Sequence, residues 1–144
     1  METRFRAITG LALLLAAGQP ALAGGDAAAG EDGFRRCQAC HVVRAPSGEV
    51  LAGRSARTGP DLYGLPGRVL GSQEDFAYSQ AFEEARAAGL TWDEDAFAAY
   101  LQDPGAYLSQ VMGHRLRSKM TFRLRDEAAA RDLWAYLESL SAPE

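Results

Sequence analysis

The chain has 144 residues, of which 47% are hydrophobic and 24% are charged. This composition fits one globular domain with one core, and it excludes the collagen-like, coiled-coil and disordered classes. The 15 basic and 19 acidic side chains give a formal charge of −4 at pH 7, so we expect no general affinity for the phosphates of nucleic acid.

The first 23 residues are predicted to be a cleaved signal peptide. Arg4 and Arg6 make the start basic, residues 8–17 form a short apolar run, and Ala21-Leu22-Ala23 is typical of a cleavage site. The run is shorter than the roughly 20 residues that cross a bilayer. We therefore expect a periplasmic protein with no membrane span after cleavage, and one domain over residues 24–144 with a formal charge of −5.

Both cysteines lie in the run Cys37-Gln38-Ala39-Cys40-His41. Three uses of such a run compete. A thioredoxin-like redox pair needs a preceding strand and a following helix, which the flanking residues do not predict. A zinc site needs about four ligands, and only His114 and scattered carboxylates remain. The third use is covalent attachment of a c-type haem, for which Cys-x-x-Cys-His is the signature, and this is the use we favour.

The first predicted elements are two helices separated by a long loop. Residues 26–36 predict a helix that begins at an Asp26 N-cap and brings Phe34 to the core. Residues 42–71 contain six glycines and three prolines without periodicity, which indicates a long structured loop. Residues 74–88 predict the second helix.

Three further helical segments follow. The pattern from Thr91 to Glu94 is that of a capping box, which opens a helix through Gln102. Residues 106–112 predict one or two more turns. Asp126 caps a final helix, whose apolar positions recur at helical spacing: Ala130, Leu133, Leu137 and Leu140. No segment alternates as a strand does, so the predicted fold class is all-α.

These helices are too short to enclose a core by themselves. Much of the chain is loop, and a domain of this size is only marginally stable even when it is well filled. A large apolar ring in the middle would supply the missing interior. This argument predicts a haem independently of the cysteine run.

Several separate motifs follow the cysteine run: residues 58–68, Trp92, residues 100–104, residues 119–122 and residues 133–137. With these motifs in this order, the chain resembles a class I cytochrome c, the small type with histidine and methionine as axial ligands, over nearly all of residues 24–144. The resemblance implies the cytochrome c fold, with short helices and long loops wrapped around one haem c attached through Cys37 and Cys40. It also implies an electron carrier that is not an enzyme.

The same resemblance implies the axial ligands. His41 is the proximal ligand, and the carbonyl of Pro60 accepts a hydrogen bond from its second ring nitrogen. Met120 is the distal ligand, because a thioether is soft and, with histidine, raises the reduction potential. On residue type alone, Pro60 would fit a simple turn.

Four more side chains match positions with a role in this family. Arg68 and Trp92, with Tyr78 as a third, match donors of hydrogen bonds to a buried haem propionate, which needs such donors. On residue type alone, Trp92 fits simple core packing equally well. Tyr100 matches a position whose hydroxyl lies near the methionine sulfur.

One segment departs from the family pattern. Residues 109–118 replace a shorter connection, and they contain two alternative distal ligands, Met112 and His114. A packed methionine and a surface histidine are the commoner explanations for such residues, and neither lies in the Lys-Met-Thr-Phe context of Met120. Ligation by His114 would lower the reduction potential.

Basic charge concentrates in residues 35–71, with a net charge of +4, and in residues 104–125, with a net charge of +5. In the family these segments surround the exposed haem edge. We therefore expect a monomer with a basic docking face, which steers it toward redox proteins with an acidic docking surface. The alternative is that these charges only serve solubility.

The predicted function is outer-sphere transfer of one electron at a time between periplasmic redox partners, such as those of a respiratory chain. One alternative is a haem enzyme or gas sensor with an open or labile distal site. Another is the dedicated electron-accepting subunit of a periplasmic dehydrogenase. The unusual segment 109–118 is the only sequence feature that favours either alternative.

Overall fold

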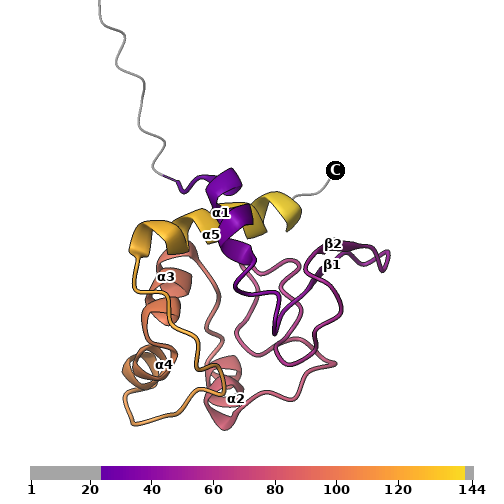
Figure 1. Cartoon of the computed structure of the whole chain (residues 1–144). Helices are drawn as coiled ribbons and strands as arrows, with labels where there is room; N and C mark the ends of the chain where they lie inside the picture. The colour runs from indigo at the N-terminus through magenta and orange to yellow at the C-terminus, as the bar shows by residue number, and fades with distance from the viewer. Residues whose placement is uncertain (1–23, 142–144) are drawn as a thin grey trace, which may run out of the picture.

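The computed structural model describes residues 24–141, so the predicted signal peptide, residues 1–23, lies outside the described residues and stays a prediction. Within them, helices and one small sheet follow in the order α1, β1, β2, α2, α3, α4, α5. Long loops join these elements (Figure 1). The predicted class of short helices and long loops is therefore confirmed.

Helices α1 (Ala27–Phe34) and α5 (Glu127–Ser141) cross in direct contact (Figure 1). Asp26 is the predicted N-cap of α1, and its side chain accepts two backbone N–H groups of the first turn. Gly30 is buried at the crossing, where a Cβ atom would fall 2.8 Å from the Cβ atom of Tyr136. The crossing therefore needs Gly30, although glycine weakens a helix interior.

Helix α2 (Gln80–Ala87) begins six residues later than the predicted residue 74. Residues 74–79 are irregular instead, and this places Phe76 and Tyr78 against the same cavity. Side chains two residues apart on a helix point in nearly opposite directions. The irregular backbone is thus what brings both rings to one side.

Helix α3 (Glu94–Gln102) begins at Asp93, whose side chain accepts the N–H of Ala96 at 2.7 Å. The predicted capping box at Thr91 is therefore wrong. Thr91 pairs with Val69 in a short antiparallel bridge, so its backbone is engaged in extended pairing and the cap moves two residues along the chain.

Helix α4 (Pro104–Met112) makes more of the chain helical than the one or two turns predicted there. Pro104 lies in the first turn, where its missing N–H costs no hydrogen bond. Gly113 ends the helix in the left-handed conformation, with φ of 74°. Part of the unusual segment 109–118 is therefore helix, and what remains before Met120 is a loop, called here the insert loop, residues 113–119.

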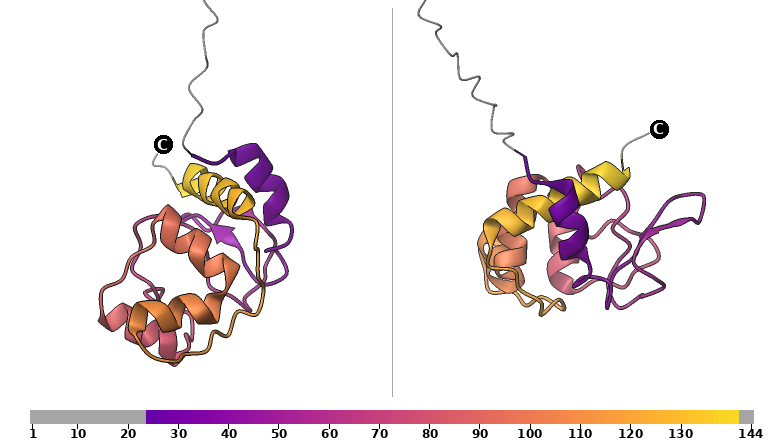
Figure 2. Two further views of the ribbon diagram at one scale, coloured as in Figure 1. Left: turned by 90° about the vertical axis from the view of Figure 1, so that its left-hand side faces the viewer. Right: turned by 45° about the horizontal axis from the view of Figure 1, so that its top comes forward.

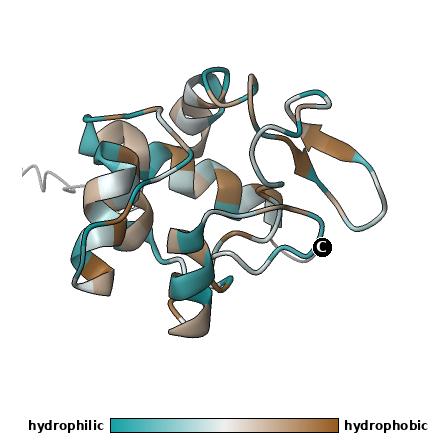
Figure 3. Ribbon diagram, turned by 90° about the horizontal axis from the view of Figure 1, so that it is seen from below, coloured by the Kyte–Doolittle hydropathy of each residue, from teal (hydrophilic) through white to brown (hydrophobic). Residues whose placement is uncertain are grey.

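The predicted loop over residues 42–71 contains a small hairpin, contrary to the prediction of no strand. Strand β1 (Val43–Arg44) pairs antiparallel with strand β2 (Val50–Ala52), with an irregular register. Viewed from below, the hairpin lies at one edge of the molecule (Figure 3). Two such short strands leave the fold class unchanged.

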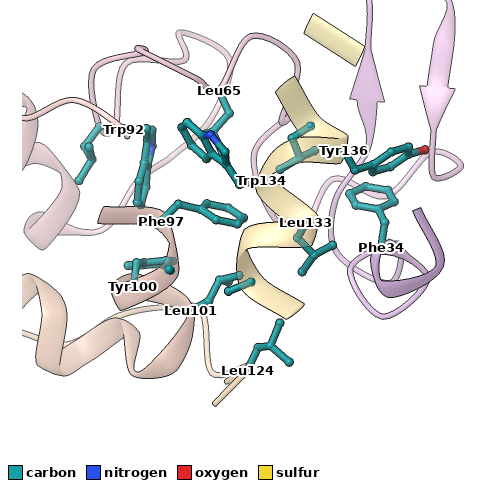
Figure 4. Close-up of a cluster of buried hydrophobic side chains, with 14 of the residues drawn as sticks. Phe34, Leu65, Trp92, Phe97, Tyr100, Leu101, Leu124, Leu133, Trp134 and Tyr136 are labelled. Carbon is teal, nitrogen blue, oxygen red and sulfur yellow. The ribbon is translucent and has the colours of Figure 1, made fainter. Parts of the chain in front are cut away.

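The core is a continuous cluster of aromatic and aliphatic side chains (Figure 4). Phe34 of α1 packs against Tyr136 of α5, with 5.7 Å between ring centroids. Phe97 of α3 packs against Trp134 of α5 at 5.5 Å. The three helices are thus joined by aromatic contacts, which prefer such tilted geometries.

In Figure 1 the other elements lie below the crossed pair. α3 and α4 lie toward one end of the molecule and the hairpin toward the other, as Figure 1 and the right-hand view of Figure 2 show. None of the helices within residues 24–141 is long and apolar enough to cross a membrane.

Candidate functional site

The residues singled out in the sequence meet around one internal cavity. It holds about 290 Å³ of space open to a water-sized sphere, far more than the roughly 10–15 Å³ that one water molecule needs. The cavity therefore has room for a large ligand. Every predicted site residue lines it: Cys37, Cys40, His41, Pro60, Arg68, Tyr78, Trp92, Tyr100 and Met120.

The cysteine run lies in turns that directly follow α1. The N–H groups of Cys40 and His41 donate to the carbonyl of Cys37, at 3.1 and 2.9 Å. Burial raises the pKa of the Cys37 thiol to about 11, whereas a redox-active cysteine has a lowered pKa. The run also follows a helix, where a thioredoxin-like pair follows a strand. Neither feature favours thiol–disulfide chemistry.

His41 is oriented by one hydrogen bond. Its Nδ1 donates to the carbonyl of Pro60 at 2.8 Å. Because the proton is on Nδ1, Nε2 keeps the lone pair with which a neutral imidazole binds a metal. Burial lowers the pKa of His41. The hydrogen bond to Pro60 and the negative charge of Asp61 raise this pKa, but by less. The ring is therefore neutral at pH 7, as a ligand must be.

Gly59 lies directly against this ring. A Cβ atom at position 59 would fall 2.6 Å from Nδ1 and 2.7 Å from Nε2 of His41, closer than nonbonded atoms approach each other. Only glycine leaves room for the ring in this position. Gly59 was not predicted as a site residue, although it precedes Pro60 in one of the motifs that carry the family resemblance.

Met120 reaches the cavity from the irregular segment after the insert loop. Its N–H donates to the Oγ atom of Ser118 at 3.1 Å, and the same Oγ atom lies 3.2 Å from the hydroxyl of Tyr100. Burial raises the pKa of Tyr100 to about 12, so this hydroxyl keeps its proton at neutral pH. Ser118 also lines the cavity, and no sequence pattern pointed to it.

The two alternative distal ligands lie elsewhere, because neither Met112 nor His114 lines the cavity. Met112 is the last residue of α4 and packs against the core. His114 has 53% of its side chain exposed, and its Nε2 atom lies 2.7 Å from a carboxylate oxygen of Glu84. This geometry favours Met120 over both.

Polar side chains line another part of the cavity. Arg68 donates to the carbonyls of Tyr63 and Asp61, at 2.9 and 3.0 Å, so part of its guanidinium holds the loop. Trp92 is 6% exposed. Burial lowers the pKa of Arg68 and raises the pKa of Tyr78, so that burial disfavours the charged form of each.

Ser79 is a further lining residue that was not predicted. Its Oγ atom is buried and has no hydrogen-bond partner within residues 24–141. Because a buried hydroxyl without a partner is costly, we expect a bound group to bring a polar atom into the cavity beside Ser79.

No cluster of three His, Cys, Asp or Glu side chains suited to a metal ion is found among the described residues. The zinc alternative therefore has no ligand set in that part of the chain.

The residues present fit a haem c. Two thiols, a neutral imidazole with one nitrogen already engaged, and a thioether are the groups that such a haem requires. The walls between them are largely apolar, as a porphyrin ring needs: they include Leu62, Leu65, Phe82, Leu101 and Leu133. The buried hydroxyl of Ser79 is suited to a propionate.

Comparison with curated proteins gives close relatives, although no family model matches the chain. The chain is similar to cytochrome c2 of Cereibacter sphaeroides, with 44% identity over 144 residues that cover 98% of each chain. It is also similar to cytochrome c2 of Rhodovulum adriaticum, with 50% identity over 121 residues, which cover 83% of this chain and 96% of the relative.

Solved structures agree with the curated relatives. A crystal structure of cytochrome c2 from Rhodobacter sphaeroides superposes with a TM-score of 0.80 at 46% identity, covering 83% of this chain and 99% of that chain. The structure of ferric cytochrome c-550 from Paracoccus versutus superposes with a TM-score of 0.74 at 37% identity, covering 82% and 99%. The expected cytochrome c fold is confirmed.

Proposed function

The chain belongs to the cytochrome c2 group of class I cytochromes c, and on that premise we propose that it carries single electrons between exported redox proteins with His41 and Met120 as the ligands of its haem iron. It is an electron carrier, and it holds one haem c through Cys37 and Cys40. The observation that carries the proposal is that both candidate ligands line the same cavity as the two cysteines.

His41 would hold the iron through Nε2 and Met120 through its sulfur. The hydrogen bond from Nδ1 of His41 to Pro60 fixes the tautomer and orients the ring. Ser118 holds the backbone of Met120, and Tyr100 is within hydrogen-bond distance of Ser118. When bound, the haem would supply a one-electron couple, and with His41 and Met120 holding it the protein itself would make and break no bonds.

The chain needs no catalytic residue for this activity. Its residues attach the cofactor, keep water away from it and tune its potential. A haem enzyme or gas sensor would need an open or labile distal position. Met120 in the cavity, with Met112 and His114 outside it, speaks against that alternative.

The propionate contacts come from the polar part of the cavity wall. Arg68, Tyr78 and Trp92 are the expected donors, and Ser79 joins them because its buried hydroxyl has no partner among the described residues. A carboxylate taken out of water needs several such donors. Arg68 gives two N–H groups to backbone carbonyls, which leaves it others for a propionate.

Partner recognition uses the basic side chains of Arg36 and of the segment 104–125, which carries the distal ligand. Arg36 lines the cavity, and its guanidinium lies 5.2 Å from the centre of the Phe122 ring. Three arginines of the segment 104–125 form no ion pair with a carboxylate of residues 24–141: Arg115, Arg117 and Arg125. These charges are available to attract acidic redox proteins over distances of about a Debye length.

The carrier works in the periplasm, as a monomer, after removal of residues 1–23. The basic start, apolar run and small-residue cleavage site of those residues support export.

Absorption spectra of the oxidised and reduced protein, recorded with and without carbon monoxide, test the proposed ligation. We expect the spectrum of a haem c with sulfur ligation, unchanged when carbon monoxide is added to the reduced form at neutral pH. Rapid carbon monoxide binding would contradict the proposal, because it would show that the distal position is open or labile.

The docking face has its own test. The second-order rate of electron transfer with an acidic redox protein should fall as ionic strength rises. Arg117→Gln should lower this rate at low salt, whereas Arg86→Gln, which makes the same change of charge outside the two basic segments, should lower it less. A rate that does not depend on salt would contradict this part of the proposal.

A further inference from the structure

The insert loop runs beside the start of α2. Residues 115–119 of the loop and residues 79–81 form the two sides of one open cleft. Because the cleft separates the two segments along this line, the polar contacts that join the loop to residues 77–84 help to hold it there.

Two side chains of the insert loop reach this segment, those of Lys119 and His114. The ammonium group of Lys119 donates to the carbonyls of Ala77 and Tyr78, at 3.0 and 3.1 Å. Nε2 of His114 lies 2.7 Å from Oε2 of Glu84. The insert loop is thus tied to the segment from residue 77 to residue 84 at two points.

The Glu84 carboxylate is itself held in place. Its second oxygen, Oε1, accepts a hydrogen bond from Nε2 of Gln80 at 2.9 Å, one turn earlier on α2. A fixed acceptor of this kind loses less side-chain entropy when it binds a partner. Glu84 is therefore a prepared anchor for His114.

We propose that His114 and Glu84 are positioning residues that hold the insert loop against α2 and so limit how readily Met120 leaves the iron. This inference rests on Met120 as the distal ligand. The loop ends next to Met120, and a longer loop has more freedom when it is untied. Releasing His114 therefore gives the segment that carries the ligand more freedom to move away.

Hydrogen exchange of the Leu116 amide in the haem-loaded protein tests the proposal. This N–H of the insert loop donates to the Oγ atom of Ser109 on α4 at 2.8 Å, so its exchange reports opening of the loop whichever residue binds the iron. For an exposed pair we expect Glu84→Gln to speed the exchange about two- to fivefold. His114→Ala, which removes the other partner of the same contact, should have an effect of the same size.

A second readout is the affinity of added imidazole for the oxidised iron. In Glu84→Gln this affinity should rise by the same factor, about two- to fivefold, because imidazole binds when Met120 leaves the iron. Asp32→Asn is the matched control, because it removes an equally simple exposed ion pair on α1. Equal effects of Glu84→Gln and Asp32→Asn on Leu116 exchange would overturn the proposal. If exchange responds as expected but Met120→Ala leaves the iron spectrum unchanged, the ligand assignment fails and the effect on Met120 falls with it.

Discussion

The hydroxyl of Tyr100 lies 3.2 Å from the hydroxyl of Ser118, and Ser118 accepts the backbone N–H of Met120 at 3.1 Å. Tyr100 is on α3 and Ser118 is in the insert loop, so this pair joins a helix to the segment that carries the candidate ligand. Through Ser118, the position of Met120 is coupled to a rigid part of the fold.

Ser118→Ala should therefore loosen Met120. The change leaves the Met120 N–H and the Tyr100 hydroxyl without this partner, and we expect a loss of about 1–3 kcal/mol in the free energy of unfolding. The absorption band of iron–sulfur ligation in the oxidised protein should also weaken. Ser139→Ala is the control, because it removes a hydroxyl that binds only a helix carbonyl, that of Tyr136. Equal effects of the two substitutions would show that Ser118 has no special role.

Gly59→Ala should impair haem attachment. The added methyl group would meet the ring of His41 at less than 3 Å, so either the ring or the loop must move, at a cost of about 1–3 kcal/mol. The measurement is the haem content per polypeptide after export. Gly33→Ala is the control. It adds the same methyl group on α1, 3.5 Å from a methyl carbon of Leu133, where alanine favours the helix by up to about 1 kcal/mol. Its haem content should equal that of the parent protein. Normal haem content in Gly59→Ala would refute the argument.

Three single substitutions identify the distal ligand. Met120→Ala should abolish the spectral signature of sulfur ligation and let carbon monoxide bind the reduced protein. Met112→Ala and His114→Ala should keep that signature, because neither residue lines the cavity. Loss of sulfur ligation in Met112→Ala would instead assign the iron to the end of α4.

Local patterns were sufficient where the residues that decide an element are neighbours in the chain. The Asp26 cap and the Cys-x-x-Cys-His run are of this kind, and the helix and the cavity wall that they predict are present. The start of α2 was missed because Phe76 and Tyr78 turn toward a cavity that distant segments build. The cap was wrongly predicted at Thr91 because Val69, far away in sequence, pairs with that residue.

The same distinction applies to the site. All nine residues proposed from the sequence line the cavity; the family motifs carry eight of them, and Tyr78 lies outside those motifs. Gly59, Ser79 and Ser118 were missed, since their importance comes from distances to His41, to the cavity and to Tyr100 that no spacing in the sequence reveals. A glycine needed for its lack of a side chain is recognised only once the ring beside it is placed.

Tyr100 should make the protein lose stability above pH 10. Burial raises the pKa of this hydroxyl to about 12 in the folded protein, whereas a tyrosine in an unfolded chain titrates near 10. Below pH 10 both states keep the proton, so Tyr100 contributes no pH dependence there. Between about pH 10 and pH 12 the unfolded chain binds fewer protons than the folded protein, so stability falls as pH rises, by up to about 3 kcal/mol.

Denaturant unfolding of the parent protein and of Tyr100→Phe at several pH values from 8 to 12 separates this contribution from the others. The difference at pH 8 measures the lost contact with Ser118 alone. With increasing pH the free energy of unfolding should fall faster in the parent than in the variant. The advantage of the parent at pH 8 should therefore shrink to about zero or reverse. Parallel curves across this range would mean that the Tyr100 hydroxyl is open to water in the folded protein, and the tight contact between α3 and the insert loop would have to be abandoned.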